Sequence, residues 1–451
     1  MNYARCTTLL AFLFAFLCGL PPSVSAQGAD NEWQALNNEA QALYRAGKYD
    51  RAISVGQKAL QFAEDNFSPD HPNVGKSLNE LGGLYDVLGD YSKAEPLYLR
   101  SLAISEKAYG PEHSNVGTIL NNLAVLYSKQ GANTKAEPLY KRALAITEKA
   151  LGPDHPDVGT SLSNLATLYR NQGYYAKAEP LYKRSLAITE IAVGPDHPSV
   201  GAILSNLARL YRTSGDYAKA EPLYERSLAI REKTLGPNHP DVGTSLNGLA
   251  ELYRTLGDYG KAEPLYLRSL AIWEKALGPD HPNVGTGLNT LATLYRSLGD
   301  YAKAEALYKR SLAIREKSLG PDHPSVGTSL NDLGGLYEIL GDYSKAEPLY
   351  LRSLAIWEKA YGPEHSNVGT ILNNQAVLSQ KQGDIAKTEP LYKRALAIKE
   401  KALGPDHPEV ATILRDLATL YRATQRVSEA DLLEERVTKM RAEKRRDGLL
   451  K

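Results

Sequence analysis

The chain repeats itself every 42 residues, and this period constrains its fold more than any other feature of the sequence. All nine histidines are spaced by 42 residues, from His71 to His407. The stretch VGTSLSNLATLYRNQGYYAKAEPLYKRSLAITEIAVGPDHP, residues 158–198, recurs with few changes in eight units over 73–408. A unit this short cannot bury its own apolar faces, so we expect the units to stack into one elongated domain.

A longer repeat is superimposed on the short one. The stretch AYGPEHSNVGTILNN occurs at 108–122 and again at 360–374, six units later. The stretch LGGLY, at 81–85 and at 333–337, shows the same spacing. We infer that a block of six units was duplicated as a piece. Growth of this kind lengthens a surface, which favours an interaction protein over an enzyme.

Each unit has the apolar pattern of two helices. Leu162, Leu165, Ala166 and Tyr169 occupy positions i, i+3, i+4 and i+7, which lie on one face of a helix. The same spacing returns over 178–186. The sequence therefore predicts an all-α chain in which every unit is a pair of helices.

The recurring GPDHP stretch indicates the turn between units. Gly194 can take the left-handed conformation that ends a helix, and Pro195 cannot continue one. In the preceding turn, Asp154 or His155 is placed to cap the next helix, whose first turn tolerates Pro156.

A ladder of metal-binding or catalytic histidines is the alternative interpretation of the same pattern. Each unit supplies only one histidine, and packed helices stand about 8–10 Å apart. Zinc holds its nitrogen ligands at about 2 Å. We therefore expect the histidines to pack turns, and we expect no metal ion and no cofactor.

The N-terminus has the features of a secretory signal peptide. Arg5 precedes the apolar stretch Leu9–Leu20, and small residues before Gln27 predict cleavage after Ala26. An uncleaved anchor and a cytosolic adaptor with a misread start are the alternatives. Both cysteines lie within this segment, so the mature chain has none. We expect a secreted or periplasmic protein.

The two ends of the repeat array are diverged. We predict a signal peptide over 1–26, a lead with a diverged repeat over 27–72, eight repeats over 73–408, and a diverged repeat with a capping helix over 409–451. In the last unit, Gln425 replaces the turn glycine, and a charged helix, EERVTKMRAEKRRDGLLK, closes the chain. That helix could bind an anionic surface or serve as a solvated cap.

The positions shared by the units resemble the tetratricopeptide repeat. The resemblance rests on the pattern Leu165-Ala166, Tyr169, Gly173, Tyr175, Ala178 and Tyr182. The 42-residue length and the stretches LNNLAVLY (120–127) and AEPLYKRALAI (136–146) are similar to the kinesin light chain variety. The resemblance implies a right-handed superhelical solenoid of antiparallel helix pairs. It also implies that the first helices line a concave groove that binds extended or short helical peptides. A signal peptide stands where kinesin light chains have a coiled coil, so we expect no motor heavy chain as partner.

Carried onto this chain, the resemblance implies that asparagines near the start of the LA motif face the groove. Asparagine amides both donate and accept hydrogen bonds, so a row of them could pair with a peptide backbone of any sequence. They could instead bond to neighbouring helices. The candidates are Asn79, Asn121, Asn122, Asn164, Asn206, Asn247, Asn289, Asn331, Asn373 and Asn374.

Tyr169 and its equivalents in the first helices of the next three units are each followed by an arginine. These arginines are Arg170, Arg212, Arg254 and Arg296. In the flanking units this residue is Asp86, Ser128, Glu338 or Gln380, and near the end it is Arg422. Guanidinium groups match carboxylates in geometry and charge. If this position faces the groove, with Arg209 adding to the row and Glu251 offsetting it, the central groove should prefer an acidic peptide or a free C-terminal carboxylate. A solvated charged face is the alternative.

The remaining sequence gives no case for catalysis. The stretch VGKS at 74–77 lacks the first glycine of a phosphate loop, and no G-x-S-x-G, H-E-x-x-H or C-x-x-C motif occurs. Lys+Arg and Asp+Glu are nearly balanced, at 53 against 52, which argues against nucleic acid as a partner. We expect a monomeric, non-enzymatic scaffold for protein or peptide partners without a membrane span after cleavage. A self-assembling surface protein whose end caps stack is the alternative.

Overall fold

The computed structural model describes residues 26–449, and all twenty elements in that range are α-helices. They form ten pairs, each with a first and a second helix. The first helices are α1 (Ala26–Arg45), α3 (Pro72–Val87), α5 (Ser114–Lys129), α7 (Pro156–Asn171), α9 (Pro198–Ser214), α11 (Pro240–Leu256), α13 (Pro282–Leu298), α15 (Pro324–Ile339), α17 (Ser366–Lys381) and α19 (Pro408–Ala423). The second helices are α2 (Tyr49–Asn66), α4 (Tyr91–Tyr109), α6 (Asn133–Leu151), α8 (Tyr175–Val193), α10 (Tyr217–Leu235), α12 (Tyr259–Leu277), α14 (Tyr301–Leu319), α16 (Tyr343–Tyr361), α18 (Ile385–Leu403) and α20 (Val427–Leu449).

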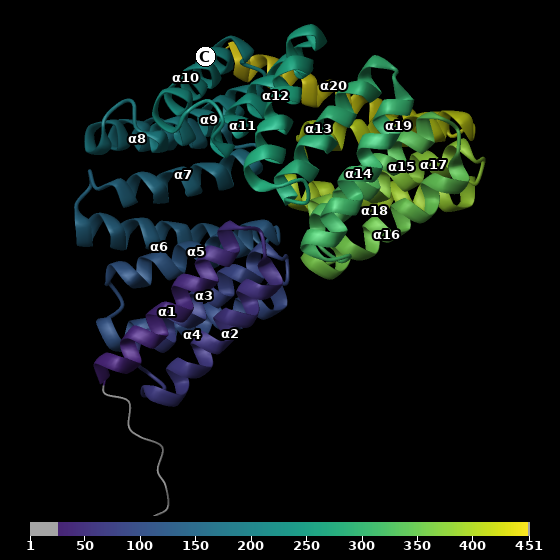
Figure 1. Cartoon of the computed structure of the whole chain (residues 1–451). Helices are drawn as coiled ribbons and strands as arrows, with labels where there is room; N and C mark the ends of the chain where they lie inside the picture. The colour runs from purple at the N-terminus through teal and green to yellow at the C-terminus, as the bar shows by residue number, and fades with distance from the viewer. Residues whose placement is uncertain (1–25, 450–451) are drawn as a thin grey trace, which may run out of the picture.

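Each helix packs against the one before it and the one after it. The pairs therefore stack in chain order and curve into a superhelix (Figure 1). This confirms the predicted all-α solenoid of helix pairs.

The turns that join one unit to the next are built around the histidines, and we call them the histidine turns. All nine histidines are N-caps: in His155, for example, Nδ1 accepts a hydrogen bond from the backbone N–H of Asp157, at 3.2 Å. Pro156 occupies the first helical turn behind it. Of the two capping candidates in the sequence, the histidine and not Asp154 is the cap. Because Nδ1 accepts, each imidazole in this role carries its proton on Nε2.

The turns within units, between first and second helix, are here called the hairpin turns. They are centred on Gly47, Gly89, Gly131, Gly173, Gly215, Gly257, Gly299, Gly341, Gly383 and, in the last unit, Gln425. Each of these residues has a positive φ, which glycine adopts without strain. Gln425, with a φ of 60°, is the one residue other than glycine among those described with a positive φ.

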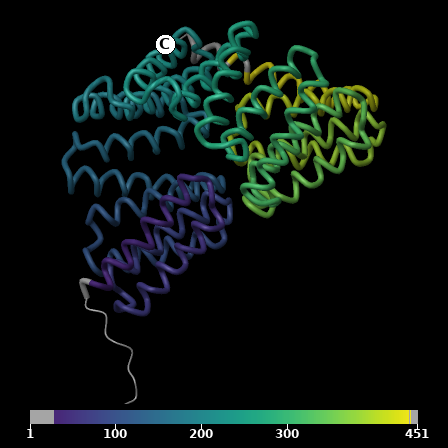
Figure 2. The backbone as a smooth tube through the Cα atoms, viewed as in Figure 1, coloured from purple at the N-terminus to yellow at the C-terminus, as the bar shows by residue number. Residues whose placement is uncertain are grey.

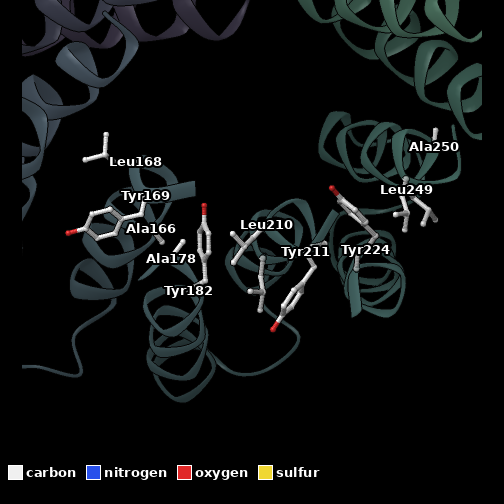
Figure 3. Close-up of a cluster of buried hydrophobic side chains, with 14 of the residues drawn as sticks. Ala166, Leu168, Tyr169, Ala178, Tyr182, Leu210, Tyr211, Tyr224, Leu249 and Ala250 are labelled. Atoms are coloured by element: carbon white, nitrogen blue, oxygen red, sulfur yellow. The ribbon is translucent and has the colours of Figure 1, made fainter. Parts of the chain in front are cut away.

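The core runs continuously along the stack and is built from the same positions in each unit. Six tyrosines of the second helices, from Tyr182 to Tyr392, are among the largest fully buried side chains. Figure 3 shows part of this core, where Ala166, Tyr182, Leu210 and Tyr224 come from four consecutive helices of one cluster. The helical faces predicted from the apolar spacing are the faces that are buried.

The superhelix makes more than one turn, and its successive turns touch (Figure 2). The hairpin turns of the first four units lie against the last four histidine turns. A side-chain carbon on Gly47 would lie 2.9 Å from His281, and on Gly131 it would lie 2.6 Å from His365. The corresponding partners of Gly89 and Gly173 are Pro324 and His407. We call this set of contacts the inter-turn contact.

Candidate peptide-binding groove

The first helices form the inside of the curved stack. From α3 to α19, each first helix contacts the first helix of the next unit as well as its own second helix. In a curved row the elements on the inner side lie closest together. We call these first helices together the inner row, and all predicted groove residues belong to them.

The predicted asparagines are distributed along α3 to α17. Asn289 is buried, and the others are half-buried. Their positions are Asn79 on α3, Asn121 and Asn122 on α5, Asn164 on α7, Asn206 on α9, Asn247 on α11, Asn289 on α13, Asn331 on α15, and Asn373 and Asn374 on α17.

Many of these amides bond to the neighbouring helix. Asn122 Nδ2 donates to Asn79 Oδ1 at 3.0 Å, and Asn164 Nδ2 donates to Asn121 Oδ1 at the same distance. Further along, Asn374 donates to Asn331 at 2.7 Å. Several of the asparagines therefore use part of their hydrogen-bonding capacity to join neighbouring first helices. This was the alternative to binding a peptide backbone.

Two other asparagines bond to an aspartate or a threonine on the first helix of the next unit. Asn289 Nδ2 donates to Asp332 Oδ2 at 2.8 Å, and Asn247 Oδ1 accepts from the hydroxyl of Thr290 at 2.9 Å. Asp332 was not singled out in the sequence. Its carboxylate is enclosed between α13 and α15, and burial raises its pKa.

The four predicted arginines lie near the ends of α7, α9, α11 and α13, and two of them are joined by a carboxylate. Arg254 pairs with Glu251 of its own helix, with Nη2 3.0 Å from Oε2 and Nε 3.3 Å from Oε1. Arg212 reaches across from α9, with Nη1 4.0 Å from the same Glu251 Oε2. Glu251 therefore offsets the charge of the row at α11, as expected.

Arg170 has no such carboxylate among the described residues. Its guanidinium donates to Asn171 Oδ1 at 3.0 Å, and its Nη1 is buried without a hydrogen-bond partner. Burial lowers the pKa of Arg170, and the nearby charges of Arg209 and Arg212 lower it further. Arg209 is exposed on α9. These three residues, Arg170, Arg209 and Arg212, form what we call the arginine cluster.

The flanking parts of the inner row are already paired. Asp86 accepts from Lys129 of the next first helix at 2.6 Å, and Glu338 accepts from Lys381 at 2.8 Å. Arg422 on α19 pairs with two carboxylates of α20. Among the described residues, the arginine cluster is therefore one part of the inner row where arginines outnumber their carboxylate partners.

A cavity of about 870 Å³ lies elsewhere, between the two turns of the superhelix. It is lined by the hairpin turn at 128–134, by Asn171, Gln172 and Tyr174, and by the histidine turns at 361–367 and 401–409. None of the predicted groove residues lines it. The sequence analysis missed this cavity because it depends on which units meet after a full superhelical turn.

The structure gives the histidines a capping role, and the described residues contain no group of three or more metal-ligand side chains close enough to hold a metal ion. A search of the described helices for one long and apolar enough to cross a membrane finds none. The predicted signal peptide, apart from its last residue, lies outside the described residues.

Comparison with known proteins identifies the repeat. The sequence profile of the tetratricopeptide repeat matches nine overlapping stretches that together run from residue 34 to residue 443. No curated protein gave a significant match to the chain.

Many solved structures resemble the chain, and three of them illustrate the range of similarity. BtubC (BKLC) from P. vanneervenii is 27% identical over 52% of this chain and 92% of its own, with a TM-score of 0.40. The nearly identical TPR-like repeats of a kinesin light chain of Podosopora anserina are 31% identical over 46% of this chain and 97% of their own, with a TM-score of 0.39. Rap protein complexed with Competence and Sporulation Factor is 16% identical over 92% of this chain and 98% of its own, with a TM-score of 0.53.

Proposed function

The chain belongs to the tetratricopeptide repeat family, with repeats of the kinesin light chain-like type, and from this premise we propose that its inner row binds an acidic segment of a partner protein. Repeat scaffolds of this kind mediate protein interactions and are generally not enzymes, and we propose no catalytic activity for this one. The observation that supports the choice of ligand is the arginine cluster.

An acidic ligand would relieve an electrostatic imbalance in this cluster. Arg170 is disfavoured as a cation by burial and by its two arginine neighbours. A carboxylate placed among the three guanidinium groups would supply the counter-charge that Glu251 already supplies to Arg254. Charge-assisted pairs of this geometry are among the stronger hydrogen bonds in proteins. We therefore place the acidic end of the ligand beside α7 and α9.

The half-buried asparagines would hold the rest of the segment. Asn206, on the same helix α9 as Arg209 and Arg212, makes no hydrogen bond to another described side chain, so its amide is available to a peptide backbone. The hypothesis that asparagines bind the peptide backbone is therefore limited to fewer residues than the sequence suggested, because several other amides in the row already bond to neighbouring helices.

We further propose that binding takes place outside the cytoplasm, in the periplasm or after secretion. The support is the signal-like segment before Gln27. The chain after it has no cysteine, so it needs no oxidising compartment and tolerates one. Sequencing the N-terminus of the natural protein tests this directly. A chain that starts at Gln27 supports export, and a chain that keeps Met1–Ala26 in a cytosolic fraction contradicts it.

The binding proposal is tested with residues 27–451 and labelled peptides of one length, rich in Asp and Glu or in Gln, each with a free or an amidated C-terminus. We expect the acidic peptide to bind more tightly than the Gln peptide and its affinity to fall with salt. The variant combining Arg170→Glu, Arg212→Glu, Arg254→Glu and Arg296→Glu should lose binding. A matched control reverses four arginines whose guanidinium groups pair with carboxylates of other second helices: Arg184→Glu, Arg226→Glu, Arg268→Glu and Arg310→Glu.

Capture from an extract of the source cells uses the same two variants as bait. A partner held by the wild type and the control but lost from the inner-row variant would carry the acidic segment. Equal affinity for the acidic and Gln peptides, or equal loss in both variants, would rule out recognition by the arginine cluster.

A further inference from the structure

We propose that copies of this chain stack on one another along the superhelical axis, by repeating between molecules the contact that joins the two turns within each molecule. The surfaces involved are two rims. The open hairpin rim consists of the hairpin turns at Gly257, Gly299, Gly341 and Gly383. The open histidine rim consists of the histidine turns at His71, His113, His155 and His197.

The chemistry of the contact is visible where it forms inside the chain. His323 Nε2 donates to the backbone carbonyl of Val87 at 3.0 Å, while Nδ1 of the same ring accepts from the N–H of Ser325. The rings of Tyr91 and Tyr361 stack with their centroids 5.7 Å apart. Pro324 lies against Gly89, so close that a side-chain carbon there would be 2.5 Å from it.

The duplicated six-unit block carries a second copy of both sides of this contact. Residues 88–104 and 340–356 are identical, and so are residues 108–122 and 360–374. Gly89 and Tyr91 therefore have counterparts in Gly341 and Tyr343, all on hairpin turns.

The opposite side of the contact is duplicated in the same way. Pro324, Tyr361 and His365 have their counterparts in Pro72, Tyr109 and His113, on the histidine turns.

These second copies do not meet within one molecule. Nothing lies within 4 Å of a side-chain carbon built on Gly341 or Gly383, whereas Gly89 and Gly131 are covered. Tyr91 is 6% exposed, but its counterpart Tyr343 is only partly buried. Tyr109 is 41% exposed, although its counterpart Tyr361 is partly buried against Tyr91. Each open rim thus presents a surface whose complement is found on the other rim.

Exposed apolar side chains mark both open rims. On the hairpin rim these are Leu256, Leu298, Ile339, Leu340 and Ile385, each between 40% and 50% exposed. On the histidine rim, Leu151 and Val193 join Tyr109, at 38% and 39% exposed. Apolar side chains that gather on one surface commonly mark an interaction site. A second copy of the chain covers them with the surface that already contacts Val87 and Gly89.

The geometry gives every contact in the stack the same polarity. The hairpin rim of one copy meets the histidine rim of the next, so the contact is heterologous and leaves one free rim at each end of the stack. Such a contact extends into a filament and does not close into a dimer. This association differs from the end-cap stacking considered from the sequence, and it departs from the expectation of a monomer. It leaves the inner row open and does not depend on the proposed ligand.

The test is sedimentation velocity of residues 27–451 over about 1 µM to about 1 mM, a range that covers weak self-association. We expect the average mass of the wild type to rise steadily with concentration, beyond that of two copies. Tyr109→Asp blocks the histidine rim and Tyr343→Asp blocks the hairpin rim, so each variant alone should stay monomeric. A mixture of the two retains one good rim of each kind and should stop at a dimer.

Leu351→Asp is the matched control, because Leu351 is 51% exposed on α16, the helix that Tyr343 begins, but lies away from both rims. It should associate like the wild type, and circular dichroism should show all variants folded. A wild type that stays at one mass throughout would overturn the proposal. So would a control that loses association, or a mixture of the two rim variants that remains monomeric.

Discussion

The hairpin turns at Gly89 and Gly341 have the same sequence and opposite surroundings. Both belong to the stretch LGDYSKAEPLYLRSLAI, and both glycines have a positive φ, 69° and 76°. Gly89 is covered by Pro324 of the next superhelical turn, and Gly341 is bare. The local conformation is thus set by the unit, while the environment is set by the unit's place in the superhelix.

Comparing these two positions separates the contribution of local interactions to stability from the contribution of the inter-turn contact. A substitution made at both positions changes the same local interactions twice, and the difference between the two results measures the inter-turn contact alone. The three predictions below use matched positions in this way.

The largest difference in stability is expected between the variants Gly89→Ala and Gly341→Ala. Both substitutions force a side chain into the left-handed region, at a cost of about 1–2 kcal/mol. Only Gly89→Ala also drives a methyl group into Pro324, and overpacking of this kind costs about 1–3 kcal/mol. Thermal unfolding midpoints measured at a low protein concentration should therefore be lower for Gly89→Ala. Equal midpoints would mean that the two turns do not touch in solution.

Tyr361→Ala against Tyr109→Ala should show the next largest difference. Tyr361 loses its stacking on Tyr91, and aromatic pairs are worth about 0.5–1.5 kcal/mol beyond the area that they bury. Tyr109 is stacked on His113 of its own turn, as Tyr361 is on His365, so that local contribution cancels between the variants. Urea unfolding followed by circular dichroism would measure the difference, and its absence would contradict the inter-turn stack.

The third difference concerns pH. Burial lowers the pKa of His323 and of His365 to about 4, with the positive charges of Arg315 and Lys129 near His323, and of Lys399 near His365, acting in the same direction. An unfolded histidine titrates near pH 6.5. The unfolded chain therefore binds more protons between these values, and stability is lost as the pH falls from about 6.5 towards 4.

Asparagine is the replacement that isolates this effect, because it can still cap a helix but does not titrate in this range. The double variant His323→Asn, His365→Asn should show a flatter fall of the unfolding midpoint between pH 6.5 and pH 4. The matched variant His71→Asn, His113→Asn changes the same cap on the open rim and should follow the wild type more closely. The cap change is the same in both variants, so their difference at the acidic end reports the lowered pKa values of His323 and His365, at about 1.4 kcal/mol for each pKa unit. Identical slopes in the two variants would contradict the prediction.

The sequence was sufficient to predict the helix pairs because the fold of each unit depends on local pattern. The face formed by Leu162, Leu165, Ala166 and Tyr169 is buried as expected, and the histidine and proline of each turn start the next helix. A repeat of short period leaves little choice of topology, because each unit must pack on its neighbours.

The candidate groove was only partly predictable. The positions on the first helices follow from the repeat, but the hydrogen bond from Asn164 to Asn121 and the shared Glu251 between Arg212 and Arg254 depend on side-chain reach between helices. The buried cation Arg315 was also missed. Its pKa is lowered to about 10 by burial, and it occupies a position that the other units fill with Ser, Thr, Arg, Trp or Lys.

The inter-turn contact could not be predicted from the pattern of one unit. It joins residues more than 230 positions apart, such as Val87 and His323, and depends on how much each unit rotates relative to the last. The duplication was visible in the sequence, but it did not show which turns meet. Small rotations accumulate along the stack, so the partner of a given turn is a property of the whole superhelix.

The inter-turn contact also determines how the molecule responds to a stretching force, because successive turns of the superhelix touch when no force is applied. A force along the axis must first part four turn-on-turn contacts, which lie side by side along one rim. They would open one after another from an end, releasing length in small reversible steps while every helix pair stays folded. The protein should therefore resist extension at low force and then become compliant, with the forces of unit unfolding well above both regimes.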